Sequence, residues 1–240
     1  MQHAKQGKPM SQFSMSNPFG EIFAHNANLW FATHAELLAS ESLREVLPIF
    51  HQAADMIADP QVRNRGTIGG SLANSDPAAD WPAVVIALNA ELEIAGPNGS
   101  RRVTAKDFFV DIFTTALEPT EVLAAIYLAR PASSARFTYR KIRHPASGYA
   151  VVGVAVGLRA ENGLVAEMSI GITGAANHAF SADVATEFLM AKQLSIEAIE
   201  EAAKLVSGAT VCLADRYASA EYRASLVRTE TKRALLALAA

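Results

Sequence analysis

Residues 62–82 of the chain read VRNRGTIGGSLANSDPAADWP. The adjacent glycines Gly69 and Gly70 let backbone amides approach a ligand without interference from a Cβ atom, and we expect a short helix to begin directly after them. Such a loop suits a diphosphate, whose oxygens accept hydrogen bonds from exposed amides and from hydroxyl donors such as those of Thr67 and Ser71. The spacing is neither that of a Walker loop nor the three-glycine fingerprint of a Rossmann unit.

The same loop also has a simpler interpretation. A Gly-Gly pair between two helices is typical of a plain turn. Arg63 and Arg65 fit both interpretations, because two arginines neutralise a diphosphate and equally keep a surface loop soluble. The glycine pair taken alone therefore does not decide between ligand binding and a turn.

Helical signals flank the loop. Residues 33–36 (THAE) form a capping box, and apolar residues recur at helical spacing from 41 to 57. The pair Asp59-Pro60 is expected to end that helix. We expect a loop over residues 61–74 and then a buried helix over residues 81–88.

The middle of the chain carries strand signals. The turn PNG at residues 97–99 predicts a hairpin, and the turn ENG at residues 161–163 predicts a second one. Strands are expected at 91–95, 101–104, 122–129, 137–142, 149–159 and 164–173.

The last third of the chain changes to helical periodicity. Helices are expected at 182–192, 196–206 and 220–238, with N-caps at Ser181, Ser195 and Ser219. The charged residues of the last helix are expected to form a solvated face. These residues are Arg223, Arg228, Glu230, Lys232 and Arg233. Separate sheet and helix patterns of this kind indicate an α+β fold.

Composition narrows the class of protein. Half of the residues are apolar, and the net charge of −3 disfavours nucleic acid or an anionic membrane surface as a partner. With Cys212 as its only cysteine, the chain forms no internal disulfide and no four-cysteine iron–sulfur or zinc site. We assign no metal, because the six histidines show no metal-ligand spacing. Without an apolar run of membrane-spanning length or a signal peptide, the expected location is cytoplasmic.

Taken as one string, residues 62–82 resemble the FAD-binding subunit of the molybdenum hydroxylases, the family that includes aerobic carbon monoxide dehydrogenase and xanthine dehydrogenase. Residues 139–152 (YRKIRHPASGYAVV) resemble the family's strand and loop near the isoalloxazine ring, and residues 220–223 (AEYR) resemble its C-terminal domain. The resemblance extends from about Thr33 to the end. The family often has Asn where this chain has Ser71, and a short hydroxyl donor replaces an amide donor there.

The resemblance implies FAD as the cofactor and a set of residues that contact it. These are Thr67, Ile68, Gly69, Gly70, Ser71, Asp80, Leu123, Lys141 and Tyr149. No catalytic acid or base is implied, since the flavin carries the redox chemistry. Plainer interpretations stand beside it. Asp80, four residues after Asp76, fits a solvated helical face or an N-cap, Lys141 fits a solvent-facing strand position, and Tyr149 fits a core position.

The resemblance also implies an organisation in parts. Residues 1–28 are expected to be poorly ordered. Residues 29–132 are expected to form a FAD-binding subdomain with a small, mainly antiparallel sheet flanked by helices. Residues 133–240 are expected to form a C-terminal flavoprotein domain that combines a short antiparallel sheet with a helical bundle.

The implied function is electron transfer within a hetero-oligomer. Electrons pass from the iron–sulfur centres of a small subunit, which a molybdopterin-bearing large subunit reduces, through FAD to an external acceptor. The family's first glycine motif, Ala-Gly-Gly-x-Ser, is absent from this sequence, so weak or partner-dependent FAD binding is expected. Two alternatives remain: an assembly module of the same complex that holds no FAD, and a loop that binds another nucleotide or diphosphate.

Overall fold

The computed structural model describes residues 31–239, and the segment 1–28 expected to be poorly ordered lies outside them. The helices are α1 (His34–Ala39), α2 (Glu41–Val46), α3 (Pro48–Asp55), α4 (Pro60–Arg63), α5 (Ile68–Asn74), α6 (Trp81–Ala87), α7 (Ala105–Phe108), α8 (Asp183–Leu189), α9 (Ile196–Ala209) and α10 (Ala220–Ala239). The strands are β1 (Glu91–Gly96), β2 (Gly99–Thr104), β3 (Phe109–Asp111), β4 (Thr114–Thr115), β5 (Val122–Tyr127), β6 (Arg136–Arg143), β7 (Ala150–Glu161), β8 (Leu164–Thr173) and β9 (Phe180–Ser181). None of the described helices is long and apolar enough to cross a membrane.

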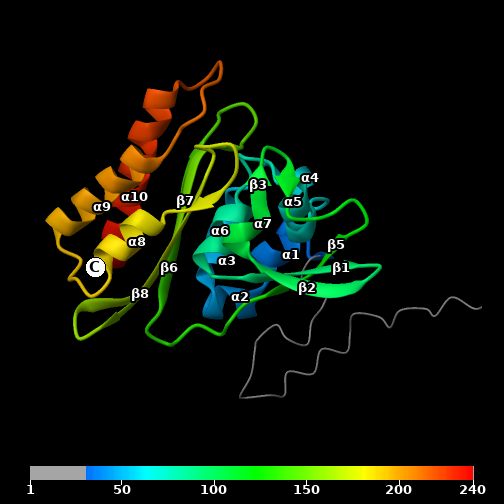
Figure 1. The fold of residues 1–240 in the computed structure, drawn as a ribbon, viewed down its shortest axis with the longest axis horizontal. Coiled ribbons are helices and arrows are strands. Elements are labelled where there is room, and N and C mark those ends of the chain that lie inside the picture. The colour runs from blue at the N-terminus through cyan, green and yellow to red at the C-terminus, as the bar shows by residue number, and fades with distance from the viewer. Residues whose placement is uncertain (1–30, 240) are drawn as a thin grey trace, which may run out of the picture.

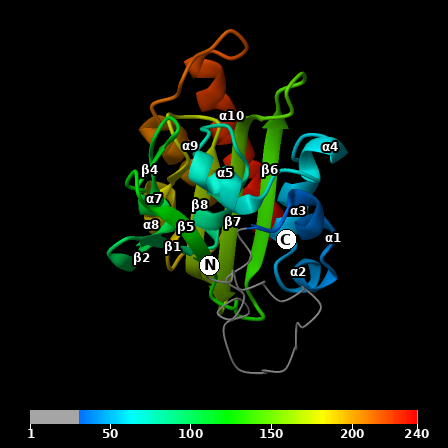
Figure 2. The ribbon, with the colours of Figure 1, turned by 90° about the vertical axis from the view of Figure 1, so that its right-hand side faces the viewer.

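The largest sheet is antiparallel, has the order β6-β7-β8-β9, and forms the central layer of the molecule. Helices cover both of its faces. On one side α10 packs against β6 and β7, with α9 packed in turn against α10; on the other side α3 and α6 pack against β6, β7 and β8. Figures 1 and 2 show the orange and red C-terminal helices on one side of this sheet and the blue and cyan N-terminal helices on the other. This layering confirms the expected α+β fold.

Strand β7 is buried on both faces, and its alternate residues belong to different cores. Val152, Val154 and Val156 pack with the C-terminal helices, whereas Ala155 packs with α3 and α6. This follows from the period of two along a strand, which sends successive side chains to opposite faces. The two hydrophobic cores of the chain therefore meet at one strand.

Helix α6 lies almost directly on the backbone of β7 and β8. A Cβ atom at Gly171 would collide with the carbonyl oxygen of Ala83, and one at Gly157 would lie 2.9 Å from the carbonyl oxygen of Ala87. The Ser169 hydroxyl donates to the same Ala87 carbonyl at 2.5 Å. Small residues on these strands thus admit α6, all seven residues of which are buried.

The second sheet has the order β2-β1-β5 and is also antiparallel. Its β1–β2 hairpin turns where Gly99 adopts a φ of 114°, as the PNG signal predicts. The predicted ENG turn joins β7 to β8, with left-handed backbone at Asn162 and Gly163. Both hairpin predictions are confirmed. The turns form at these residues because a positive φ at Asn or Gly carries little steric cost.

Several predicted element boundaries were wrong. The helix expected over 41–57 is broken after α2, where Pro48 starts α3. Helix α3 ends at Asp55, shortly before Asp59-Pro60, and Asp59 is in addition the N-cap of α4. Residues 61–74, expected as a loop, contain most of α4 and all of α5, and α5 begins at Ile68, before the glycines rather than after them. Ser195 and Ser219 accept hydrogen bonds at helix starts as predicted, whereas Ser181 lies in β9.

The predicted solvated face of α10 was also wrong at two positions. Arg223 is 6% exposed and donates to the carbonyl oxygens of Val151 and Gly174, and Glu230 is 1% exposed. Glu230 accepts hydrogen bonds from Arg140 on β6 at 3.1 Å. Charged side chains of this helix therefore bind it to the sheet. Their partners in the sheet compensate for the hydration that the buried charges lose.

The close approach of α6 to β8 predicts unequal effects of two Gly→Ala substitutions. Gly171→Ala should lower the free energy of unfolding by about 1–3 kcal/mol or more, because α6 must shift to admit the methyl group. Gly208→Ala in α9, where no described atom lies within 4 Å of the added Cβ, should raise it by up to about 1 kcal/mol. Urea denaturation of both variants measures this, and equal effects would contradict the packing described.

Candidate functional site

The glycine loop is held in place by its own cap and by a neighbouring segment. Thr67 is the N-cap of α5, and its Oγ1 accepts a hydrogen bond from the Gly70 amide at 3.0 Å. Backbone hydrogen bonds from His34 N to Gly66 O, at 2.9 Å, and from Ile68 N to Ala32 O, at 3.1 Å, tie the loop to the chain before α1. Its own cap and the neighbouring segment therefore fix the loop without a ligand.

Two backbone amides of this loop are left over. Within residues 31–239, the N–H groups of Thr67 and Gly69 meet no acceptor, although Gly69 is buried. Buried amides in native proteins are nearly always paired, so an unpaired one indicates a ligand or an ordered water. The loop thus offers two amide donors of the kind from which the anionic oxygens of a diphosphate accept. The amide of Ile68 is not available, because Ala32 occupies it.

A buried histidine stands behind the loop. His34 is 5% exposed, its Nδ1 accepts a hydrogen bond from Trp81 Nε1 at 3.0 Å, and its Nε2 would collide with a Cβ at Gly66. Burial, and then the nearby charge of Arg63, together lower the His34 pKa to about 4. The ring is therefore neutral at physiological pH, with its proton on Nε2 because Nδ1 is the acceptor.

The two arginines before the loop differ. Arg63 donates to the carbonyl oxygens of Ile57, at 2.8 Å, and Ala58, at 3.2 Å, so it closes the turn between α3 and α4. Arg65 is exposed. Unlike Arg63, Arg65 does not donate to these carbonyl oxygens.

Asp80 and Lys141 lie together in the structure. Asp80 ends the segment before α6, Lys141 lies on β6, and the lysine Nζ is 2.8 Å from the carboxylate. Asp80 is 5% exposed and the Lys141 side chain 0%. Burial raises the pKa of Asp80 and lowers that of Lys141, while each charge opposes the shift of the other. The Tyr139 hydroxyl also donates to Asp80, at 2.5 Å.

The solvent-facing interpretations of these two charged residues were wrong, because both side chains are buried. Asp80 is the N-cap residue of α6, as one interpretation had it, but its side chain makes no capping hydrogen bond. The sequence reasoning also missed Tyr139 and His34. For Tyr139 a signal existed, because residues two apart on a strand share a face, and Tyr139 shares one with Lys141. His34 lies in the capping-box sequence, and nothing in that local pattern indicates its hydrogen bond with Trp81 Nε1.

Leu123 and Tyr149 lie on other elements. Leu123 is buried on β5, the strand that packs against α5, and so belongs to the wall behind the glycine loop. Tyr149, in the turn between β6 and β7, is 48% exposed and is not a core residue. Partial burial, and then the charges of Asp76 and Asp80, raise the pKa of the Tyr149 hydroxyl.

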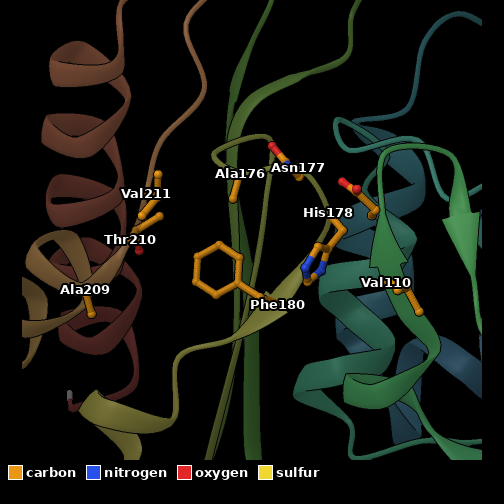
Figure 3. Close-up of a pocket in the computed structure, with 9 residues that line it drawn as sticks. Val110, Ala176, Asn177, His178, Phe180, Ala209, Thr210 and Val211 are labelled. Atoms are coloured by element: carbon orange, nitrogen blue, oxygen red, sulfur yellow. The ribbon is translucent and has the colours of Figure 1, made fainter.

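A hollow of about 380 Å³ lies elsewhere, between the loop after β8, the end of α9 and β3. Figure 3 shows Phe180 and His178 between Val110 on one side and Thr210 on the other. None of the predicted cofactor residues lines this hollow. Nor does any group of three or more His, Cys, Asp or Glu residues within 31–239 come close enough to hold a metal ion.

Known proteins resemble this chain along most of its length. Two family models match it: the FAD binding domain in molybdopterin dehydrogenase over residues 31–131 and the CO dehydrogenase flavoprotein C-terminal domain over residues 137–238. The carbon monoxide dehydrogenase medium chain of Afipia carboxidovorans is 36% identical, over 85% of this chain and 70% of the relative. The nicotine 6-hydroxylase medium subunit of Paenarthrobacter nicotinovorans is 32% identical, over 85% and 71%.

A solved structure agrees with these sequence matches. Carbon monoxide dehydrogenase from Hydrogenophaga pseudoflava superposes with a TM-score of 0.84 and 35% identity, covering 87% of this chain and 73% of that one. At this level of identity the likeness extends beyond the fold to the family.

The neutral state of His34 predicts a pH dependence of stability. Because its folded pKa of about 4 lies below the ordinary 6.5, the unfolded chain binds the proton more tightly. The stability present above pH 6.5 should therefore be lost progressively as the pH falls from 6.5 towards 4. His34→Asn keeps an acceptor for Trp81 but does not titrate, so its unfolding free energy should fall less over this range. Urea titrations at several pH values measure this, and parallel profiles for the two proteins would refute it.

Proposed function

The chain belongs to the family of the FAD-binding medium subunits of molybdenum hydroxylases, and we propose that it holds FAD on the loop Thr67–Ser71 and passes electrons through it. The resemblance expected from the sequence is confirmed by both family models and by relatives 35% identical or more. As an oxidoreductase flavoprotein subunit, the chain has its place in a complex with an iron–sulfur small subunit and a molybdopterin large subunit.

The observation that carries this proposal is the pair of unpaired amides at Thr67 and Gly69. Diphosphate oxygens accept from such groups. Gly70 is exposed, so the first turn of α5 presents backbone rather than side chains to a ligand. The hydroxyl of Ser71 lies in the same turn. Bound there, FAD would supply the electron-accepting and electron-donating ring of the reaction.

Four further residues are proposed to complete the site. Tyr149 offers a half-exposed ring on which a flavin can stack, and Leu123 supplies apolar wall. Asp80 and Lys141 form a buried charged pair beneath the surface, and Lys141 also donates to the Met56 carbonyl at 3.1 Å. Their role is to fix local charge beside the cofactor. No residue of this chain is assigned a proton-transfer step.

We also propose the division of the chain expected from its sequence. Residues 29–132 form the FAD-binding subdomain and residues 133–240 the C-terminal domain, a division compatible with the gap between the two family matches at residues 131 and 137. The cytoplasmic location stays a prediction.

A visible absorption spectrum tests the proposed function directly. The full chain should show flavin bands when purified alone or when co-expressed with candidate small and large subunits. Flavin bands that appear only in the complex would locate part of the cofactor's contacts on partners. A complex that forms without any flavin would overturn the proposal in favour of an assembly role.

Loss of the α5 cap should weaken FAD binding specifically. Thr67→Val removes the oxygen that accepts from Gly70 and should lower FAD affinity by about tenfold, since the loop amides lose their fixed positions. Titration of the chain or complex with FAD, followed by flavin fluorescence, measures the change.

Ser195→Ala is the matched control for this substitution. Its hydroxyl caps α9 in the same way, by accepting from the Ala198 amide at 3.2 Å, far along the chain from the glycine loop. This variant should bind FAD like the wild type while losing comparable helix stability. Equal losses of affinity in both variants would show that the effect is one of global stability. Equal wild-type affinities for FAD and ADP would show that the loop recognises only the diphosphate.

A further inference from the structure

The buried carboxylate of Asp80 has a second partner that the proposed cofactor site does not account for. Tyr139 Oη donates to Asp80 Oδ1 at 2.5 Å, and Tyr139 is itself 3% exposed. A carboxylate removed from water retains its charge only if donors replace its hydration. Lys141 is one such donor and Tyr139 is the other.

The geometry keeps Tyr139 in the role of donor. Burial, and then the Asp80 charge, raise the Tyr139 pKa well above its ordinary value, so the phenol stays protonated wherever the protein is folded. Asp80 in turn has its pKa raised by burial and lowered by Lys141, Tyr139 and the more distant Arg143. The hydroxyl therefore favours the ionised carboxylate, which in turn holds the ammonium of Lys141.

The surrounding strands are built to admit this phenol. Tyr139 is paired with Ala155 and Lys141 with Gly153 in the β6–β7 ladder. A Cβ atom at Gly153 would collide with Tyr139 Oη, so the glycine leaves the space through which the hydroxyl reaches Asp80. The backbone of Tyr139 is fixed as well, since its amide donates to Gln52 Oε1 on α3 at 2.8 Å.

We infer that Tyr139 is a positioning residue for the flavin site, which keeps Asp80 ionised and thereby fixes both the charge and the place of the Lys141 ammonium. This inference rests on the proposed function, because the charge of the Asp80–Lys141 pair would act on a bound flavin. Tyr139 need not touch the cofactor. It acts through Asp80, donating to Oδ1 while Lys141 donates to Oδ2.

The charged and titratable groups that face Asp80 come from two places. Lys141, Tyr139 and Arg143 belong to β6, and Tyr149 belongs to the turn after it. Helix α6, which begins directly after Asp80, contributes only apolar residues. Because Tyr139 stays protonated, proton uptake at this centre falls on the Asp80–Lys141 pair, and substitution of one donor changes a small, defined set.

The test uses the full chain loaded with FAD, alone or in its complex, with Tyr139→Phe compared against Tyr127→Phe. Tyr127 is the matched control, because its hydroxyl also donates to a carboxylate at 2.5 Å, that of Glu93 in the second sheet. The readout is the midpoint potential and visible spectrum of the bound flavin between about pH 4 and pH 10, the range over which carboxylates and amines titrate. In Tyr139→Phe the pH at which these change should rise by about one unit, the size expected for one hydrogen bond to a charged group.

Replacement of the Tyr139 ring by 3-fluorotyrosine provides a second variant, which keeps the side chain's shape. Its more acidic phenol is a stronger donor, so the same change should move to lower pH, and this variant decides the matter if Tyr139→Phe does not fold. Profiles in which both Tyr139 variants coincide with wild type and with Tyr127→Phe would overturn the inference while leaving FAD binding intact. A wild-type chain that holds no FAD even in the complex would overturn the proposed function, and the inference with it.

Discussion

The contact between α6 and the glycine-lined face of β7 and β8 is the constraint on which the site depends. Because Gly157 and Gly171 carry no side chain, the helix backbone rests on the sheet, and the segment before it is drawn into place. Thr173 Oγ1 donates to the carbonyl oxygens of Pro77 and Ala79, and the Ala150 amide donates to that of Ala78. Asp80 therefore reaches β6 in a fixed position, where Lys141 meets it.

Much of this fold was predictable from local signals. The two hairpins follow from PNG and ENG turns, whose positive φ values suit Asn and Gly, and β8 has the bounds expected for the strand after the second turn. Predictions failed where contacts between distant segments determine whether a residue is buried or exposed. Arg223 and Glu230 sit at positions that a charged helix surface would also occupy, and only the sheet across from α10 makes them buried. Residues 68–74 lacked an apolar repeat, yet Thr67 caps them as a helix.

In the candidate site, too, local features were predictable from the sequence and contacts between distant residues were not. The glycine loop was visible because its residues are contiguous, and the resemblance to a family supplied the more distant members. The bond between Asp80 and Lys141 joins positions 61 residues apart, and no periodicity specifies such a pairing. Tyr139 shares a face with Lys141 by simple alternation, but its partner depends on the empty space above Gly153. The sequence alone did not identify the carboxylate that Tyr139 and Lys141 of β6 contact.

The burial of β7 on both faces has a consequence for how the molecule opens. As an interior strand, β7 is bonded to β6 on one side and β8 on the other, and its side chains divide between the two hydrophobic cores. Neither core can come apart without uncovering one face of this strand. Amide protons of residues 152–158 should therefore exchange with solvent deuterium more slowly than those of the β1–β2 hairpin, and only through openings that involve both halves of the chain together.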